Sequence, residues 1–179
     1  LLQKATLKAA PPFFMKVTVI FGSNTGNRQE IIEKAISALA LHAGEIMEMS
    51  SYYETEPWGF DSPEVFLNRI VLFDTALSPR DFLASCLQTE QQLGRVRHTG
   101  PRYQSRTIDI DILFYESIIL NTPELTIPHP RITERNFVLI PLNELMPEFR
   151  HPVFNETIAD LLKKSPDHLL VKKLPDLNF

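Results

Sequence analysis

Residues 16–27 read Lys16-Val17-Thr18-Val19-Ile20-Phe21-Gly22-Ser23-Asn24-Thr25-Gly26-Asn27. The first six residues alternate and are rich in β-branched side chains, which predicts a strand, and the glycines and polar residues from Gly22 onward predict a tight turn. Asn27 is followed three residues later by Glu30 in the pattern of a capping box, so a helix is expected to begin there. The stretch therefore predicts a strand, a turn and a helix in direct succession.

The same alternation continues along the chain. Strands are expected at about 45–54 and 66–75, because β-branched and aromatic residues there are bounded by Pro and Gly. Ser78-Pro79 supplies an N-cap and a first-turn proline for a second helix that ends near Gly94. A further strand is expected at 107–115. These elements give the order β-α-β-β-α-β.

This order is that of a ferredoxin-like α/β sandwich, an α+β fold in which helices cover one face of an antiparallel sheet. Short helices are expected after Pro128-His129-Pro130, and a last amphipathic helix near 155–163. We expect residues 15–179 to form one domain. Residues 1–14 have scattered lysines and no continuous apolar run, so we expect a disordered leader or a remnant foreign to the natural chain.

The composition limits the class of protein. The chain has 179 residues and 44 % hydrophobic content, enough for a single buried core. One cysteine, Cys86, excludes a disulfide framework and fits a reducing cytoplasm. No uncharged apolar run approaches the roughly 18 residues needed to cross a bilayer, so no membrane partner is expected. The sequence also lacks the P-loop, dinucleotide-binding and protein-kinase motifs.

Charge is distributed unevenly along the chain. The net charge is −4 and the pI about 5.7, which argues against a general affinity for nucleic acid. Residues 95–106 nevertheless contain four arginines and no acid. A local cationic loop on an acidic protein suits a compact anion better than a long polyanion. The alternatives are a solvated basic loop, or arginines that only neutralise neighbouring acids.

Two carboxylates follow this loop in Ile108-Asp109-Ile110-Asp111-Ile112. Side chains alternate along a strand, so the isoleucines are expected to face the core and both aspartates the other side, roughly 7 Å apart at Cα. Such a pair suits Mg²⁺, which takes few carboxylates and completes its coordination with water and phosphate oxygens. The alternative is a half-exposed strand with acidic residues on its solvent side.

Three other residues each allow a structural and a functional interpretation. Glu90 lies on the apolar stripe of the second predicted helix, where it forms either a core salt bridge or part of a site. His129 is held between two prolines, and is either an exposed loop residue or a ligand-binding one. Trp58 is the only tryptophan and lies in a Pro/Gly loop, where it either covers the core or stacks on a ligand.

Five motifs, taken in order, resemble the 6-hydroxymethyl-7,8-dihydropterin pyrophosphokinase family. They are Gly22-Ser23-Asn24, Phe66-Leu67-Asn68, Glu90-x-x-x-Gly94-Arg95-x-Arg97, Arg106-Thr107-Ile108-Asp109-Ile110-Asp111-Ile112 and Pro128-His129-Pro130. The resemblance runs from about Lys16 to the last helix. It implies transfer of the β,γ-pyrophosphoryl group of ATP to the hydroxymethyl oxygen of the pterin, with release of AMP, in folate biosynthesis.

The resemblance also implies site residues. Asp109 and Asp111 correspond to ligands of two Mg²⁺ ions, and are expected to be catalytic together with Arg95, Arg97 and Arg106. The expected ATP-binding residues are Glu90, Arg97, Arg106, Ile112, Thr126, His129 and Arg135. The expected pterin-binding residues are Thr55, Pro57, Trp58, Phe66, Asn68 and Phe137, of which Asn68 corresponds to the reader of the pterin amide edge and the two phenylalanines to its stacking partners.

The chain departs from the enterobacterial pattern of the family in its arginine loop. The loop lacks a tryptophan and carries an insertion at 103–106, so the phosphate role is assigned to Arg106 and not to Arg102. Glu124 stands where a basic residue can occur, which leaves the adenosine contacts open.

Two rival interpretations are a palm-type nucleotidyltransferase, in which a Gly-Ser turn and an Asp-x-Asp pair lie close in sequence, and a non-catalytic binding module.

Overall fold

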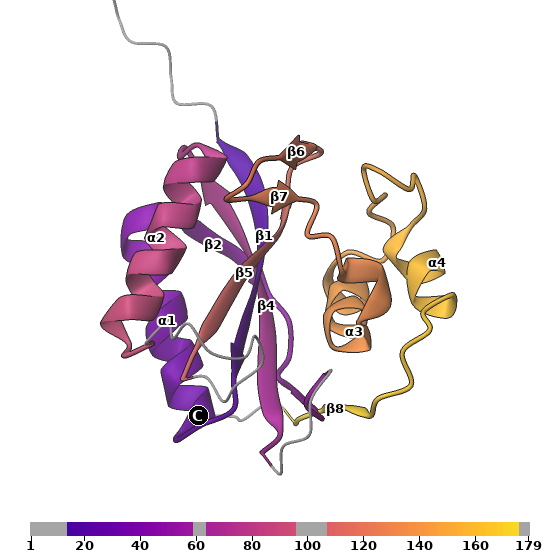
Figure 1. The fold of residues 1–179 in the computed structure, drawn as a ribbon, viewed down its shortest axis with the longest axis horizontal. Helices are drawn as coiled ribbons and strands as arrows, with labels where there is room; N and C mark the ends of the chain where they lie inside the picture. The colour runs from indigo at the N-terminus through magenta and orange to yellow at the C-terminus, as the bar shows by residue number, and fades with distance from the viewer. Residues whose placement is uncertain (1–13, 59–63, 96–106, 176–179) are drawn as a thin grey trace, which may run out of the picture.

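The computed structural model describes residues 14–58, 64–95 and 107–175. Six strands form its central sheet: β1 (Met15–Ser23), β2 (Glu45–Met49), β3 (Tyr53–Thr55), β4 (Phe66–Thr75), β5 (Asp109–Tyr115) and β8 (Val171–Lys173). The strand order is β5-β1-β4-β3-β8, and β2 pairs with β4 next to β3 (Figure 1). Every pairing in this sheet is antiparallel.

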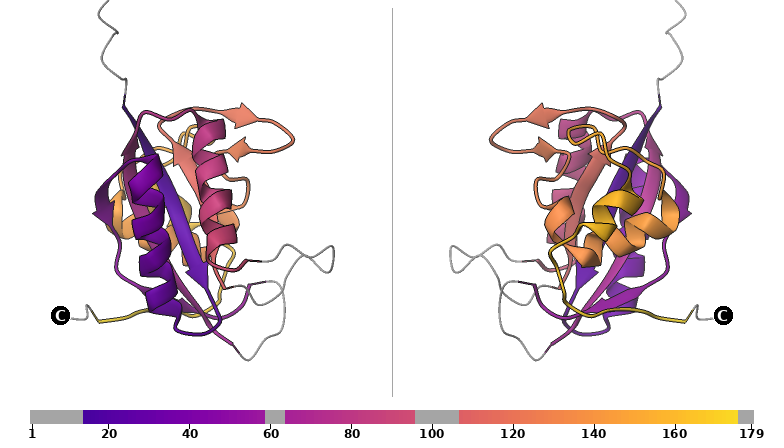
Figure 2. Two further views of the ribbon diagram at one scale, coloured as in Figure 1. Left: turned by 90° about the vertical axis from the view of Figure 1, so that its left-hand side faces the viewer. Right: turned by 90° about the vertical axis from the view of Figure 1, so that its right-hand side faces the viewer.

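Helices cover both faces of the sheet. One face carries α1 (Arg28–Ala43) and α2 (Pro79–Gln92), and the other carries α3 (Asn136–Leu145) and α4 (Ile158–Lys163) (Figures 1 and 2). The connection between β5 and α3 contains a small hairpin and one 3-10 turn. These are β6 (Leu120–Asn121), β7 (Thr126–Ile127) and η1 (Ile132–Glu134).

The predicted caps fix where the first two helices begin. The Asn27 side chain accepts a hydrogen bond from the Glu30 backbone N–H at 3.4 Å and donates to the Glu30 carboxylate at 2.9 Å. Ser78 accepts from the Asp81 N–H at 3.2 Å, and Pro79 is the first residue of α2. Both helix starts therefore confirm the signals read from the sequence.

Each face of the sheet has its own core. On the side of α1 and α2, Val19 and Phe21 of β1 pack with Phe82 of α2. On the side of α3 and α4, Ile20 of β1 packs with Leu139 of α3. Because successive residues of one strand enter different cores, β1 ties the two helical layers together.

The α+β class, the antiparallel sheet and the ferredoxin-like element order are confirmed, and three details differ. The helices expected after residue 130 and near 155–163 are present as α3 and α4, but they cover the opposite face of the sheet instead of sharing one face with α1 and α2. The strand expected at 45–54 is divided into β2 and β3 by Ser50, whose hydroxyl accepts the Ile70 N–H at 2.9 Å. The first strand continues through Gly22 to Ser23 instead of ending at Phe21.

The expected leader at 1–14 lies, except for Phe14, outside the described residues and stays a prediction. In the described part of the chain no helix has the length and apolarity needed to cross a bilayer.

Candidate active site

The two aspartates of β5 lie on one face of the sheet, as their alternation predicts. Asp109 is paired with Gly22 of β1, and Asp111 with Ile20, whose side chain belongs to the core under α3. Ile110 and Ile112 enter the opposite core. The Asp109 and Asp111 side chains therefore project together on the side of α3, and both remain partly exposed.

The environment of Asp111 disfavours a second negative charge. Burial raises the pKa of Asp111 to about 7, and the neighbouring Asp109 and Glu90 carboxylates act in the same direction against Arg135 and Arg95. Two crowded carboxylates on one strand face gain from a bound cation, which cancels their repulsion. The donor set thus fits a hard divalent cation, although no group of three His, Cys, Asp or Glu residues suited to a metal occurs among the residues described.

Two predicted site residues hold the outer edge of β5. Glu90 of α2 is 2 % exposed and accepts the backbone N–H of Ile110 at 2.9 Å. On the same edge, the backbone N–H of His129 donates to the Leu113 carbonyl at 2.9 Å. Glu90 and His129 are therefore both attached to the strand that carries the aspartate pair.

Arg95 connects Glu90 to the aspartate pair. Its guanidinium donates to the Glu90 carboxylate and, at 2.6 Å, to the Asp109 carboxylate. Arg95 follows the Gly94 turn that ends α2, and this turn brings it back to β5. The buried salt bridge considered for Glu90 exists, and it is part of the aspartate site.

His129 is held as a neutral imidazole. Burial lowers its pKa to about 4, and the charges of Arg135 and Arg131 lower it further against the opposing effect of Asp109. Its Nδ1 accepts the Arg131 backbone N–H at 3.2 Å, so the neutral ring carries its proton on Nε2. The ring can therefore donate a hydrogen bond from Nε2 at neutral pH.

Arg135 links the phosphate set predicted from the sequence to the aromatic set. Its guanidinium lies 4.6 Å from the centroid of the Trp58 ring and 5.4 Å from that of Phe137. Arg131 also faces Trp58, at 5.7 Å. Trp58 thus stacks on cationic side chains, and Phe137, at the start of α3, faces the same Arg135 guanidinium.

Asn68 and Thr55 form a buried polar pair. The Asn68 side-chain nitrogen donates to the Thr55 hydroxyl at 2.9 Å, and the two residues are each 3 % exposed. Asn68 pairs with Gly22, so it projects on the same side of the sheet as Asp109. Phe66 lies two residues earlier on β4 and shares that face.

The remaining predicted residues are placed less directly. The Ile112 side chain is 4 % exposed in the core under α1 and α2, so any contact of Ile112 with a nucleotide would come from its backbone. Thr126 lies on β7, and Pro57 precedes Trp58 in the segment after β3. Arg97 and Arg106 lie outside the described residues, so their assignment stays a prediction.

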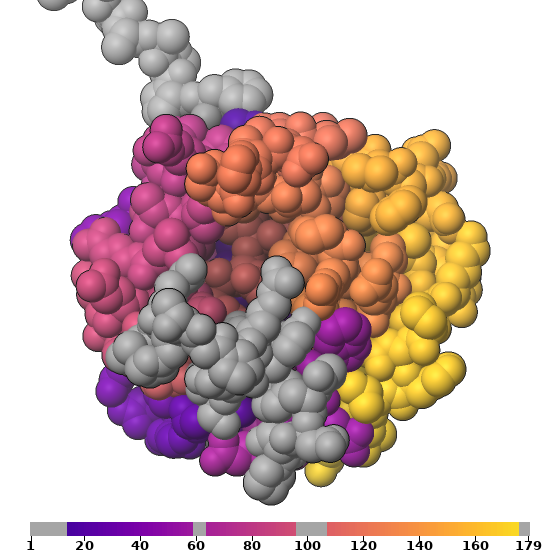
Figure 3. Space-filling view, in the orientation of Figure 1, coloured from indigo at the N-terminus to yellow at the C-terminus, as the bar shows by residue number. Residues whose placement is uncertain are grey.

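The surface is hollowed along β5, the strand that carries Asp109 and Asp111. Figure 3 shows a recess between α2 and the segment from β6 to α3, with β5 at its floor.

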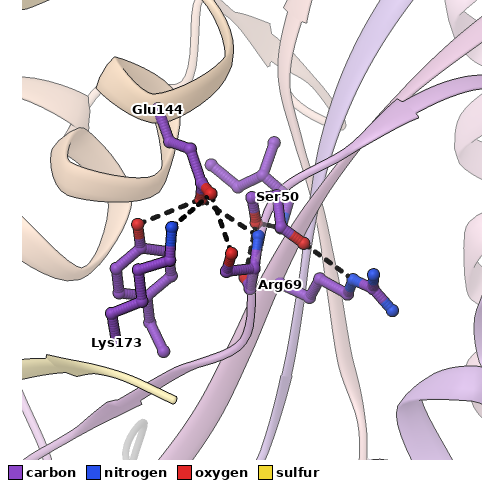
Figure 4. Close-up of polar contacts among 7 residues, drawn as sticks. Ser50, Arg69, Glu144 and Lys173 are labelled. Carbon is purple, nitrogen blue, oxygen red and sulfur yellow. Dashed lines mark hydrogen bonds and ion pairs between the residues drawn. The ribbon is translucent and has the colours of Figure 1, made fainter. Parts of the chain in front are cut away.

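A polar cluster around Glu144 was not expected from the sequence (Figure 4). The Glu144 carboxylate accepts hydrogen bonds from the Ser51 N–H at 3.0 Å, the Ser51 hydroxyl at 2.8 Å, the Tyr53 hydroxyl at 3.0 Å and the Lys173 ammonium at 2.9 Å. Burial alone would raise the pKa of Glu144, but the bonds from Lys173, Ser51 and Tyr53 outweigh it and lower that pKa. The cluster attaches α3 to β3, and β3 carries Thr55.

Comparison with known proteins agrees with this geometry. Residues 18–147 match the model of the family described as 7,8-dihydro-6-hydroxymethylpterin-pyrophosphokinase (HPPK). The 2-amino-4-hydroxy-6-hydroxymethyldihydropteridine pyrophosphokinase of Porphyromonas gingivalis is 40 % identical over 138 residues, which are 76 % of this chain and 93 % of the relative. The folic acid synthesis protein fol1 of Pneumocystis carinii is 37 % identical over 163 residues, which are 90 % of this chain and 22 % of that protein.

Solved structures show the same fold. The HPPK-DHPS of Plasmodium falciparum, crystallised with pteroate, has a TM-score of 0.70 and 18 % identity, and the match covers 88 % of this chain. It covers 43 % of the Plasmodium chain, so this chain corresponds to less than half of that protein. The family model matches residues 18–147 of this chain, and a relative is 40 % identical over a match that covers 93 % of that relative's length. This protein therefore belongs to the 7,8-dihydro-6-hydroxymethylpterin-pyrophosphokinase family.

Proposed function

We propose that this chain transfers the pyrophosphoryl group of ATP to the hydroxymethyl oxygen of 6-hydroxymethyl-7,8-dihydropterin, in the synthesis of folate. The products are AMP and the pterin diphosphate. The observation that carries the proposal is the register of β4, β1 and β5, which places Asn68 and Asp109 on one face at the same end of the sheet. Asn68, which we assign to the pterin, and Asp109, which we assign to Mg²⁺ and the ATP phosphates, can then contact the two substrates when both are bound.

Asp109 and Asp111 are proposed to hold two Mg²⁺ ions. The crowded carboxylate pair supports this, since burial and the neighbouring acids already raise the pKa of Asp111. Bound Mg²⁺ would neutralise the charge of the transferred phosphates. Arg95 keeps Asp109 in place through its 2.6 Å ion pair.

The phosphates of ATP are proposed to lie against Arg95, Arg97, Arg106, His129 and Arg135, with Glu90 and Thr126 nearby. Guanidinium groups match phosphate oxygens in a bidentate manner, and the Nε2–H of neutral His129 adds a donor without adding charge. Arg135 currently faces two aromatic rings, so engaging ATP would exchange those contacts for phosphate oxygens.

The pterin is proposed to bind Asn68 through its amide edge and to stack on Phe66 and Phe137. A carboxamide offers both a donor and an acceptor, which suits the mixed lactam and amine edge. Trp58 and Pro57 would border the ring. The Asn68–Thr55 bond holds the carboxamide before substrate arrives.

In the reaction, the hydroxymethyl oxygen forms a bond to the β-phosphorus while the bond between that phosphorus and the α,β-bridging oxygen breaks. AMP leaves with the bridging oxygen, and the hydroxyl proton passes to solvent. The protein supplies position and charge neutralisation, which is what a phosphoryl centre chiefly requires. No side chain is assigned as a general base. A chain with a single cysteine suits a reducing compartment, so we also propose a cytoplasmic location.

Product analysis tests this function directly. The protein is incubated with ATP, Mg²⁺ and the hydroxymethyl dihydropterin, and the nucleotide products are separated by chromatography. We expect AMP and pterin diphosphate in equal amounts, and no AMP when the pterin or Mg²⁺ is omitted. Release of ADP would indicate transfer of a single phosphoryl group, and absence of any nucleotide product would support a binding module; either result contradicts the proposal.

A further inference from the structure

We propose that Gly22 is a positioning residue for the pterin-reading amide of Asn68, an inference that rests on the function proposed above. Gly22 is paired with Asn68 of β4 on one side and with Asp109 of β5 on the other. Paired residues project to the same face, so this row has a functional side chain at each end and none in the middle. Strand spacing puts Asn68 and Asp109 roughly 10 Å apart across Gly22.

The Asn68 carboxamide uses the space that Gly22 leaves. A Cβ atom at position 22 would lie 2.9 Å from the Asn68 side-chain oxygen, closer than carbon and oxygen normally approach. On its other side the same carboxamide donates to Thr55 at 2.9 Å. The group is therefore fixed with its nitrogen toward Thr55 and its oxygen over β1, beside Gly22.

This orientation has a consequence for the substrate. A flat bicyclic ligand with its amide edge on Asn68 can extend across Gly22 toward Asp109, because Gly22, the residue paired between them, has no side chain. A side chain at 22 would turn the carboxamide away from the position set by Thr55 and so misplace the donor and acceptor that the ligand must meet. Gly22 thus acts through Asn68, and not by contacting the phosphates.

A double-mutant cycle tests this role with wild type, G22A, N68A and G22A/N68A. Calorimetry with the hydroxymethyl dihydropterin should show roughly five- to two-hundredfold weaker binding for G22A, the scale of one lost buried hydrogen bond. Binding of a non-hydrolysable ATP analogue should change less than twofold, because among the described residues, chain neighbours aside, a Cβ at position 22 would come within 4 Å of the Asn68 oxygen alone. In the N68A background, G22A should add no further loss, because the clashing oxygen is gone.

A second readout is independent of ligand. The side-chain amide signals of Asn68, identified by their loss from the NMR spectrum of N68A, should shift in G22A, because the carboxamide turns. If G22A alone does not fold, the double variant should fold, and failure of both would mean that Gly22 serves only the sheet. Unchanged amide signals, wild-type pterin affinity in G22A, or additive losses in the double variant would each overturn the role of Gly22. By contrast, a wild-type chain that binds no pterin would overturn the proposed function. The amide signals would still show whether Gly22 orients the Asn68 carboxamide.

Discussion

At the scale of single residues, the environment of the site shifts the pKa values of two titratable side chains. Asp111 has its pKa raised by burial and by neighbouring acids, whereas His129 has its pKa lowered by burial and by neighbouring arginines. Both shifts oppose the ordinary charged form of the side chain. Under the proposed function, a bound cation would offset the cost at Asp111, and the neutral His129 ring would donate a hydrogen bond to ATP.

Loss of either aspartate should abolish turnover without unfolding the protein. Asp109→Ala and Asp111→Ala each remove a carboxylate that we assign to Mg²⁺, and we expect turnover to fall at least about a thousandfold, the scale of about 4 kcal/mol of charge stabilisation. Steady-state AMP release measures the loss, and circular dichroism checks the fold. Activity within tenfold of wild type in either variant would remove that carboxylate from the metal site.

His129 predicts a pH dependence of stability. Its pKa of about 4 in the folded chain lies below the unfolded value near 6.5, so between these values the unfolded state binds more protons and stability is lost as the pH falls. A shift of this size corresponds to roughly 1–2 kcal/mol lost between pH 7 and pH 5. Urea unfolding of wild type and His129→Gln at the two pH values measures it. The variant should lose less stability than wild type, and equal losses would contradict the lowered pKa of His129. Burial also lowers the pKa of His151, but this residue is present in both proteins and so does not affect the comparison.

At the scale of elements, the segments of the site are held by attachments that run between distant parts of the chain. Glu144, at the end of α3, binds Ser51, Tyr53 of β3 and Lys173 of β8 (Figure 4). Next to it, the Arg69 side chain donates to the Ser50 carbonyl at 2.9 Å, at the break between β2 and β3. These bonds hold the start of β3, two residues before Thr55, whose hydroxyl accepts the hydrogen bond from Asn68.

Removing this attachment should cost both stability and pterin affinity. Glu144→Ala leaves Ser51, Tyr53 and Lys173 without their shared acceptor, so we expect the free energy of unfolding to fall by about 1–3 kcal/mol. The effect should shrink as the pH falls below 4.5, the ordinary pKa of this carboxyl group, because a lowered pKa means that the charged form of Glu144 stabilises the fold and protonation removes that contribution. Chemical denaturation gives the stability and calorimetry gives pterin affinity.

Replacement of the exposed Glu148, just beyond the helix, by Ala serves as the matched control. Glu148→Ala should change stability by less than about 0.5 kcal/mol. If Glu144→Ala behaved like this control, the cluster would be incidental to the position of β3.

The sequence predicted local features better than distant ones. The helix starts at Asn27 and Ser78 and the common face of Asp109 and Asp111 depend on residues a few positions apart, and the structure confirms them. The attachment of Glu144 joins residues 91 and 93 positions away, which no local pattern encodes. The role of Gly22 was hidden for a related reason, since a glycine at a strand end looks like a turn until the neighbouring strand is known.

At the scale of the whole molecule, two cores share one sheet. Val19 and Ile20 are adjacent in β1 but belong to different cores, so neither helical layer can separate without exposing part of the same strand. We therefore expect the two layers to unfold together.

A cavity in one core should lower the stability of both layers equally. Leu139→Ala in α3 removes a fully buried side chain and should cost about 2–5 kcal/mol. Denaturation followed by far-ultraviolet dichroism, and by the fluorescence of Trp58 on the α3 side, should give one coincident transition at a lower midpoint with an unchanged m-value. Two separated transitions would show that the layers are independent.

The attachments on the outer edge of β5 have a consequence for contacts between molecules. β5 ends the described sheet, and a terminal strand with open N–H and C=O groups can recruit a strand from another chain into a fibril. The Glu90 carboxylate accepts the Ile110 N–H, and the His129 backbone N–H donates to the Leu113 carbonyl. Two residues of the candidate site therefore also occupy backbone groups that another chain could otherwise bind. Glu90→Leu should accordingly form light-scattering, dye-binding aggregates faster than Glu148→Leu, when each variant is held equally far below its melting midpoint. Equal rates would mean that other parts of the fold protect this edge. The buried Glu90 would then serve only the ion pairs with Arg95 and, through it, Asp109.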